Sequence, residues 1–435
     1  MSNVVQAPVL VRATQVRFLV LAALCLATMI AYIDRGCISV AEKDIRAELE
    51  LTTEQMGVLL GAFFATYAIF QLPTGWLGHV WGTRWALSFF AVLWSLATAL
   101  GAVSHSYPAL LISRLGMGAA EAGVFPCATN TIARWFPANR RAWASGVLGS
   151  FMGVGAALGA ALTGGLLHVG LSWQLILAVY AAAGLVWALW FVWWFRDRPE
   201  ETASVNEAEL TLIRGDLPVE TEYTERPERT PWRAILTSPA LGWISAQQFF
   251  RAASYIFYMS WFPTYLKETH GVSTLEAGAL TSLPLWAQMF GSFAGGMLSD
   301  TILTRTGSKR WARQGQAVAS LVVCTGLIGL AYPIAEPLPA VLLISAGAFC
   351  ASLAGPCAYA VTIDMGGKQV APIFSVMNMA GNLGAIVFPI IASRLKTATG
   401  NWDAVFALFV VLHLVAAACW LPFNPEGKIV PEQRS

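Results

Sequence analysis

The stretch Gly75-Trp-Leu-Gly-His79-Val-Trp-Gly82-Thr-Arg84 lies between two long apolar runs and has a counterpart in the second half of the chain. The counterpart reads Gly296-Met-Leu-Ser-Asp300 and is followed by Arg305-Thr-Gly307. Each copy comes directly after the second apolar run of its half, which indicates that the chain consists of two equivalent halves. A duplicated unit of six membrane-spanning helices is typical of transporters built from two helical bundles.

The composition indicates a membrane protein. Of the 435 residues, 56% are hydrophobic and 12% are charged, whereas about 25% of the residues of a soluble protein are charged. The net charge of +2, without a basic patch among aromatic residues, gives no sign of a nucleic-acid partner. None of the seven cysteines forms a Cys-x-x-Cys pair. We therefore expect them to be small buried apolar side chains, and we expect no metal and no cofactor.

Twelve apolar runs are long enough to cross a bilayer, which takes about 20 residues. The first run lacks a cleavage site and is predicted to be a retained helix rather than a signal peptide. A polar stretch from Arg196 to Arg233 separates the sixth run from the seventh, with a predicted short surface helix over Asn206–Arg214. We expect an N-terminal six-helix bundle over 1–196, a linker over 197–237 and a C-terminal six-helix bundle over 238–435. The predicted spans are 17–40, 56–78, 84–103, 108–132, 142–168, 172–196, 238–266, 275–303, 313–333, 338–363, 371–396 and 401–423.

The distribution of basic residues predicts the orientation in the membrane. With the N-terminus in the cytoplasm, cytoplasmic segments carry 19 of the 27 lysines and arginines, and outer segments carry five. Cytoplasmic loops of membrane proteins are enriched in these residues. We therefore expect a multi-pass protein of the cell inner membrane, with both termini in the cytoplasm.

Four formal charges lie inside predicted spans, Asp34 and Arg35 in the first and Arg114 and Glu121 in the fourth. A charged side chain at bilayer depth is costly and usually faces a water-filled cavity or an opposite charge on a transport path. Arg114 and Glu121 are seven residues apart, so they share one helix face. Asp34 and Arg114 are expected at similar depth on neighbouring antiparallel spans, which predicts an ion pair between them.

These charges suggest how an anion and a proton could be bound together. A guanidinium group stays charged and binds a carboxylate through two hydrogen bonds, so we expect Arg35 to hold an acidic group of the substrate. A carboxyl group in a poorly hydrated cavity can gain or lose a proton as its surroundings change, so Asp34 and Glu121 are candidate proton carriers, gated by Arg114. The competing interpretation is a fixed network of charges that only orients the helices.

Six further motifs extend the pattern of the duplicated loop over the whole chain: Tyr32-Ile-Asp34-Arg35, Gln71-Leu-Pro73-x-Gly75-Trp76, Ser113-Arg114-x-x-x-Gly118-x-x-Glu121-x-Gly123-x-Phe125-Pro126, Arg134-Trp135-Phe136-Pro137, Trp261-Phe262-Pro263-x-Tyr265-Leu266 and Asn378-x-x-Gly381-Asn382. With them the chain resembles the major facilitator superfamily and, within it, the anion:cation symporter family. That family includes bacterial galactonate, glucarate and hexuronate carriers and the sialin and vesicular glutamate transporters. The resemblance implies an all-α fold of twelve helices around a central cavity, and uptake of an organic anion with protons by alternating access.

The resemblance also implies that the duplicated loop closes the cytoplasmic side. The candidate gating residues are Gly75, His79, Gly82, Arg84, Asp300 and Arg305. The chain departs from the family pattern at two positions. His79 stands where the superfamily usually has aspartate, which weakens the usual charge pairing of this loop. Tyr359 stands where sugar-acid carriers tend to have tryptophan, which leaves the identity of the substrate open.

Uncharged polar side chains within the spans are candidates for binding substrate hydroxyl groups, because polar groups need partners in a membrane. The candidate substrate-binding residues are Arg35, Tyr67, Gln71, Arg114, Gln248, Arg251, Tyr255, Tyr359, Asn378 and Asn382. Gln248 aligns with a polar substrate contact of the sugar-acid carriers. For Arg251, one turn further along, two interpretations stay open. It holds a second acidic group, or it only pairs with a carbonyl group or extends toward the membrane interface.

We therefore expect a carrier that takes up an organic anion with one or more protons. A sugar acid such as galactonate, glucarate or a hexuronate is the leading substrate class, and an aromatic or small carboxylate comes next. Exchange of organic anions or organophosphates and coupling to Na⁺ are the alternatives. The chain has no His-Glu-x-x-His, Gly-x-Ser-x-Gly or phosphate-loop motif, which argues against an enzyme. The expected partners are the lipid bilayer, the anion and H⁺, and we expect a monomer.

Overall fold

The computed structural model describes residues 12–214, 230–272 and 274–430, and these residues form helices joined by short turns, with no strand among them. A helix satisfies its backbone hydrogen bonds internally, so long apolar runs in a bilayer become helices. By length and composition alone, seven helical stretches of the described residues qualify as membrane spans. The middle of the predicted linker, 215–229, lies outside the described residues.

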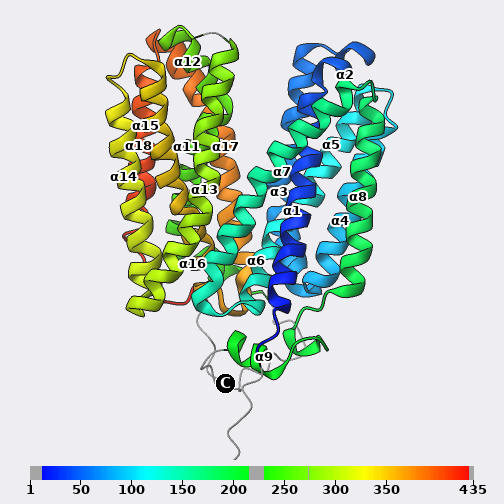
Figure 1. Ribbon diagram of the computed structural model, residues 1–435, viewed down its shortest axis with the longest axis vertical. Coiled ribbons are helices and arrows are strands. Elements are labelled where there is room, and N and C mark those ends of the chain that lie inside the picture. Colours follow the sequence, from blue (N-terminus) through cyan, green and yellow to red (C-terminus); the bar gives the residue numbers. More distant parts are fainter. Residues whose placement is uncertain (1–11, 215–229, 273, 431–435) are drawn as a thin grey trace, which may run out of the picture.

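The helices form the two groups of six spans that the duplicated motif predicts (Figure 1). The N-terminal group comprises α1 (Val16–Val40), α2 (Glu42–Glu48), α3 (Thr53–Trp81), α4 (Thr83–Ala102), α5 (Tyr107–Glu121), α6 (Val124–Trp135), α7 (Arg141–His168) and α8 (Trp173–Trp194). The C-terminal group comprises α11 (Pro239–Ser260), α12 (Phe262–His270), α13 (Thr274–Thr306), α14 (Gln316–Ala331), α15 (Pro337–Leu353), α16 (Gly355–Gly366), α17 (Val370–Thr399) and α18 (Asp403–Ala418). Two short helices, α9 (Glu207–Arg214) and α10 (Trp232–Leu236), belong to the connection between the groups. The predicted surface helix over Asn206–Arg214 matches α9.

The fourth, seventh and tenth predicted spans are each divided into two helices near a proline. The breaks separate α5 from α6, α11 from α12 and α15 from α16, just before Pro126, Pro263 and Pro356. A proline inside a helix lacks an N–H donor and its ring clashes with the carbonyl group four residues earlier, which kinks or breaks the helix. Pro73, Pro284 and Pro389 lie inside α3, α13 and α17 without dividing them. The first break comes directly after Glu121, which is therefore the last residue of α5.

The two groups meet toward the end of the molecule that carries α9, the closed end, and diverge toward the end that carries α2 and α12 (Figure 1). The helix pairs α7–α13 and α3–α17 join them. A side chain at Gly75 of α3 would collide with Ser375 of α17. A Cβ atom at Gly296 of α13 would lie 2.5 Å from the carbonyl oxygen of Ala142 in α7. Glycine at both crossings lets the backbones approach closely enough to close this end.

The first part of the predicted linker binds the N-terminal group. The buried Glu209 of α9 accepts hydrogen bonds from the backbone N–H groups of Val16 (3.1 Å) and Arg17 (3.2 Å) and from the Arg17 guanidinium group (2.7 Å). Asp197 accepts one from the backbone N–H of Thr83 at the start of α4 (2.6 Å). The first N–H groups of a helix have no partner within it, so carboxylates stabilise these two helix starts.

Candidate functional site

A cavity of about 910 Å³ lies between the two groups of helices. Arg35 of α1 and Arg251 of α11 line it from opposite groups, and no aspartate or glutamate is among its described lining residues. A wall with two arginines and no acid attracts anions. Eight of the ten predicted substrate-binding residues line the cavity: Arg35, Tyr67, Gln248, Arg251, Tyr255, Tyr359, Asn378 and Asn382.

On the N-terminal side, aromatic rings and one acid hold Arg35. Its Cζ atom lies 4.4 Å from the ring centre of Tyr32 and 4.7 Å from those of Phe63 and Tyr67. Its Nε atom donates to Glu121 Oε2 at 2.5 Å. Within the described chain, Arg35 Nη2 and Glu121 Oε1 are buried without a hydrogen-bond partner. The pair therefore has unused bonding capacity at the cavity wall, although Glu121 itself is not a lining residue.

Asp34 and Arg114 lie behind this wall. Asp34 is fully buried, and neither carboxylate oxygen has a hydrogen-bond partner among the residues that the structure describes. Arg114, 3% exposed, donates to the sulfur of Met117 (3.2 Å), and its Nε atom is unpartnered there. The expected ion pair between Asp34 and Arg114 is therefore not formed. Direct contact of Arg114 with a substrate is not supported either, because the side chain does not reach the cavity in this structure.

On the C-terminal side, Arg251 has an amide as its partner rather than an acid. Its Nε and Nη2 atoms donate to Gln248 Oε1 at 3.2 Å and 3.1 Å. No ion pair of Arg251 occurs among the described residues, whereas Arg35 is paired with Glu121. Of the two sequence-based interpretations, the location in the cavity favours a group that can bind an acid, since the positive charge of Arg251 is left uncompensated.

Gln71 and Asn378 connect the two groups next to the cavity. Asn378 Nδ2 of α17 donates to Gln71 Oε1 of α3 at 3.0 Å. Gln71 is fully buried and does not line the cavity, so it supports Asn378 rather than contacting a substrate directly. Asn382 donates to the backbone oxygen of Asn378 (3.0 Å) and stays on the cavity wall.

Trp286 and Gln288 of α13 also line the cavity, and the sequence-based prediction missed both. Gln288 is 8% exposed, and its Nε2 donor has no partner in the described part of the chain. A polar residue within a long apolar run indicates a water-filled cavity, so Gln288 could have been predicted from the sequence, and only Trp286 lacks such a signal. Tryptophans at cavities and at lipid surfaces look alike in a sequence.

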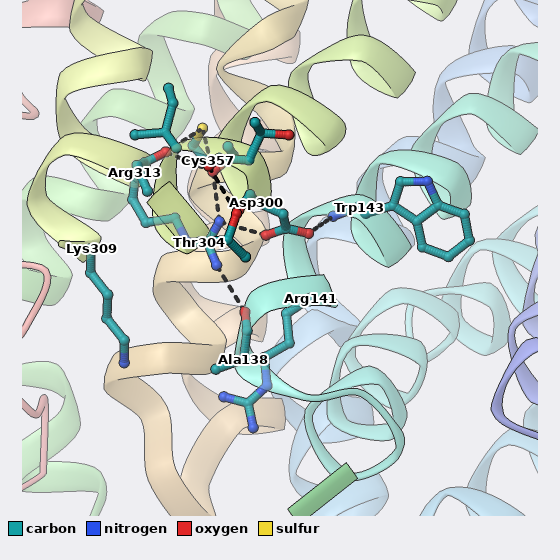
Figure 2. A network of polar contacts seen from close by, with 12 residues as sticks. Ala138, Arg141, Trp143, Asp300, Thr304, Lys309, Arg313 and Cys357 are labelled. Atoms are coloured by element: carbon teal, nitrogen blue, oxygen red, sulfur yellow. Dashed lines mark hydrogen bonds and ion pairs between the residues drawn. The ribbon is translucent and has the colours of Figure 1, made fainter. Parts of the chain in front are cut away.

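Charged residues hold the closed end together across the two groups (Figure 2). Asp300 of α13 accepts a hydrogen bond from the backbone N–H of Trp143 in α7 (2.7 Å) and another from Arg313 Nη1 (2.9 Å). Arg313, fully buried, also donates to the carbonyl oxygen of Ala138 in the other group (3.1 Å). Asp300 thus connects α13 to the start of α7 and to Arg313 at the same time.

Asp364 of α16 forms the second part of this network. Its Oδ1 atom lies 3.4 Å from Arg141 Nη1 of the N-terminal group and 3.7 Å from Lys309 Nζ of its own group. Its Oδ2 atom lies 3.4 Å from Arg313 Nε. Arg305, a predicted gating residue, is exposed at the end of α13 and has no ion pair among the described residues. Arg313, which was not among the predicted gating residues, contacts both Asp300 and Asp364.

The second part of the first loop motif, from Gly82 to Arg84, makes contacts within its own group. Gly82 has a backbone φ of 78°, which glycine adopts without strain, and Asp197 lies against it. Arg84 donates to the backbone oxygen of Val192 (2.7 Å). Burial raises the pKa of Asp197, while Arg134 and backbone N–H groups act in the opposite direction. These contacts fix the turn between α3 and α4 to the end of α8.

His79 corresponds to Asp300 in the duplicated motif and is 9% exposed. The crossing of α3 with α17 is packed through Gly75 against Ser375, whereas the crossing of α13 with α7 carries the Asp300 hydrogen bonds. Both crossings of the closed end are therefore close-packed at a glycine, and the crossing of α13 with α7 also carries the hydrogen bonds of Asp300.

Two helical bundles that are latched at one end and enclose a cationic cavity define a membrane carrier. A family model of the Major Facilitator Superfamily matches residues 24–303 and again 244–434. The chain belongs to the Major Facilitator Superfamily, which confirms the resemblance and the fold class that it implied. It is a multi-pass membrane transporter and not an enzyme.

Similar proteins carry organic anions. A "Probable sulfoacetate transporter" of Cupriavidus necator is 32% identical over 415 residues, 94% of each chain. A "Probable galactarate/D-glucarate transporter" of Bacillus subtilis is 30% identical over 93% of this chain and 90% of its own. A "D-galactonate transporter" of Escherichia coli is 29% identical over 88% of this chain and 90% of its own. These names confirm the expected relation to anion:cation symporter carriers.

Solved structures share the fold. The structure of a proton:xylose symporter superposes with a TM-score of 0.72 at 15% identity and covers 95% of this chain and 97% of its own. The human organic anion transporter MFSD10 gives a TM-score of 0.68 at 15% identity, over 94% of this chain and 100% of its own. At such identities the likeness shows the fold alone.

Proposed function

We propose that this protein takes up an organic anion together with protons by alternating access, and that a sugar acid is its leading substrate class. The observation that carries the proposal is the 2.5 Å pair of Glu121 with Arg35, an arginine on the wall of a cavity whose described lining includes no acid. Relatives named for galactarate, glucarate and galactonate support the substrate class.

The pair provides a way to couple an anion to a proton. When Glu121 is ionised, it neutralises Arg35 and competes with an incoming carboxylate for the guanidinium group. When Glu121 is protonated, the charge of Arg35 is uncompensated and the substrate carboxylate replaces the lost partner. Proton binding and anion binding then favour one another, as linkage requires. Asp34, which precedes Arg35 and whose buried carboxylate oxygens have no hydrogen-bond partner among the described residues, is the second proposed proton site.

Arg251 extends the proposal to substrates with two acidic groups. It lies on the opposite wall from Arg35 and has no acidic partner among the described residues. A compound with two acidic groups offers one partner to each arginine. Galactarate and glucarate carry two carboxylates, and sulfoacetate carries a sulfonate and a carboxylate, so we place such dianions ahead of galactonate.

The proposed orientation has the closed end, with α9, in the cytoplasm. Its support is the excess of lysine and arginine in the segments assigned to that side. In this orientation the two groups diverge toward the outside (Figure 1), and the cavity lies in reach of an external substrate.

The test records external pH in lightly buffered proteoliposomes while galactarate, glucarate, galactonate, a hexuronate and sulfoacetate are added one at a time. We expect alkalinisation with at least one of them. In Glu121→Gln, which mimics the protonated acid, we expect the pH signal to disappear while exchange of labelled substrate persists. Glu207→Gln, an exposed acid on α9, is the matched control and should behave like the unmodified protein.

Two results would contradict this proposal. Uptake of label without any pH change would indicate exchange or Na⁺ coupling instead of proton symport. An unchanged pH signal in Glu121→Gln would remove that residue from the proton path. For Arg251→Gln we expect a larger loss of transport for galactarate than for galactonate, and an equal loss for both would argue against a second anion site.

A further inference from the structure

The ring of Phe63 on α3 contacts two guanidinium groups that have different surroundings. Its centre lies 4.7 Å from Arg35 Cζ and 5.2 Å from Arg114 Cζ. Arg35 lines the cavity and is paired with Glu121, whereas Arg114 is buried outside the cavity lining and has no acidic partner among the described residues. Phe63 itself is fully buried and does not line the cavity.

Packing holds the ring in this position. A Cβ atom at Gly118 of α5 would collide with the backbone carbonyl of Phe63, so α5 and α3 are in direct backbone contact here. The ring stacks on Tyr67 with centres 5.5 Å apart and an interplanar angle of 26°. Because Arg114 and Gly118 are one turn apart on one face of α5, this close contact brings Arg114 to the ring.

Two arginines, Arg35 and Arg114, are available as partners for Glu121. Arg114 and Glu121 are seven residues apart on α5, about 10 Å along the helix axis. Two long side chains can span that distance, yet Glu121 pairs with Arg35 from another helix. Asp34 and Cys37 on α1 are near enough to interact with Arg114, and Tyr32 and Tyr67 contact Arg35. A cation is attracted to an aromatic face, so Phe63 can hold each arginine without supplying a negative charge.

We propose that Phe63 is a positioning residue that keeps Arg114 away from Glu121 and thereby assigns Glu121 to Arg35. This inference rests on the proposed function, because the assignment matters only if Glu121 carries a proton. With the ring in place, protonation of Glu121 removes the negative partner of Arg35, the arginine that lines the cavity. Without the ring, Arg114 pairs with Glu121, and Arg35 is free to bind the anion whether or not Glu121 is protonated.

The first test needs no substrate. Double-mutant cycles on the thermal unfolding of the purified full-length protein measure the coupling of Glu121 with Arg35 and with Arg114, each replaced by glutamine. We expect coupling of Glu121 to Arg35 in the unmodified protein, and a change of partner to Arg114 in Phe63→Leu. Phe63→Tyr, which keeps the ring, should retain the Arg35 coupling. The proposal would be overturned if Glu121 stayed coupled to Arg35 in Phe63→Leu. It would also be overturned if Arg114 became coupled to Asp34 instead of Glu121.

The second test measures transport of galactarate in proteoliposomes. In Phe63→Leu we expect exchange of labelled galactarate to persist while the number of protons moved per galactarate falls by about half, because Asp34, the second proposed proton site, is left in place. Phe63→Tyr should restore the ratio, and Phe70→Leu, a ring on the same helix that is 41% exposed, should leave it unchanged. A purely structural role would reduce uptake and proton movement in parallel and leave the ratio unchanged, which would refute the proposal.

The two tests distinguish the possible failures. If the unmodified protein moves no protons with any of the acids, the proposed function fails, while the unfolding cycles still report whether Phe63 selects the partner of Glu121. If Phe63→Leu does not fold, Phe63→Met keeps an apolar side chain of similar length without a ring and replaces it in both tests.

Discussion

Replacing Asp300 by asparagine should shift the carrier toward conformations that are open at the latched end. Asp300 accepts a hydrogen bond from the backbone N–H of Trp143 across the two bundles (2.7 Å) and one from Arg313 within its own bundle (2.9 Å). Only the first bond breaks when the bundles separate, so only the first contributes to the shift. A hydrogen bond to a charged group contributes about 1.5–3 kcal/mol and a neutral one about 1 kcal/mol. Asparagine keeps the acceptor oxygen and loses the charge, so the closed conformation should lose about 1 kcal/mol of stabilisation. This corresponds to about a fivefold shift of the equilibrium toward conformations that are open at the latched end.

Spin labels at the exposed positions Asn139 and Thr306, one in each bundle, report the separation of that end. We expect the population with the longer distance to rise in Asp300→Asn. Lys309→Gln is the matched control, because Lys309 approaches Asp364 (3.7 Å) from the same bundle and its contact is not broken by opening. Equal distance distributions in Asp300→Asn and Lys309→Gln would refute the reasoning.

Two further substitutions test how the carrier is held together. Glu209→Ala removes a buried carboxylate from the start of α1, and we expect it to destabilise the protein by about 2 kcal/mol and lower its unfolding temperature, whereas the exposed Glu207→Ala should not. Gly118→Ala places a methyl group against the backbone of α3 and should abolish transport or folding, while Gly116→Ala, where the nearest atom is 3.5 Å away, should be tolerated. Equal unfolding temperatures of the two variants in either pair would contradict these expectations.

The wall of the cavity shows how far sequence reasoning reaches. Arg35 and Arg251 were predictable because a charge within an apolar run must face water or a partner. Gln71 and Arg114 are also polar residues within apolar runs, but they lie behind the wall. The orientation of each helix about its axis decides which polar residues face the cavity. Conversely, Trp286 is on the wall and could not be recognised, since aromatic residues are equally common toward lipid.

The sequence could not predict which charged residues pair with one another. Depth along antiparallel spans predicted a pair of Asp34 with Arg114, but the structure pairs Arg35 with Glu121. Depth describes one dimension, whereas pairing depends on which helix faces are packed together and on the aromatic ring among them. At the latched end, Arg313 was not predicted for a similar reason, because the turn after α13 brings this residue from the start of the following span into the network.

The order of residues alone determined that this chain spans a membrane in two six-helix halves and that it has arginines within the bilayer, because apolar length, duplication and intramembrane charge are local properties of a sequence. Tertiary structure decided which arginine meets which acid, which polar groups line the cavity, and that the crossing of α13 with α7 carries the hydrogen bonds of Asp300. These features depend on contacts between helices far apart in the chain, and packing sets such contacts to within an ångström, which no spacing rule along one helix can do.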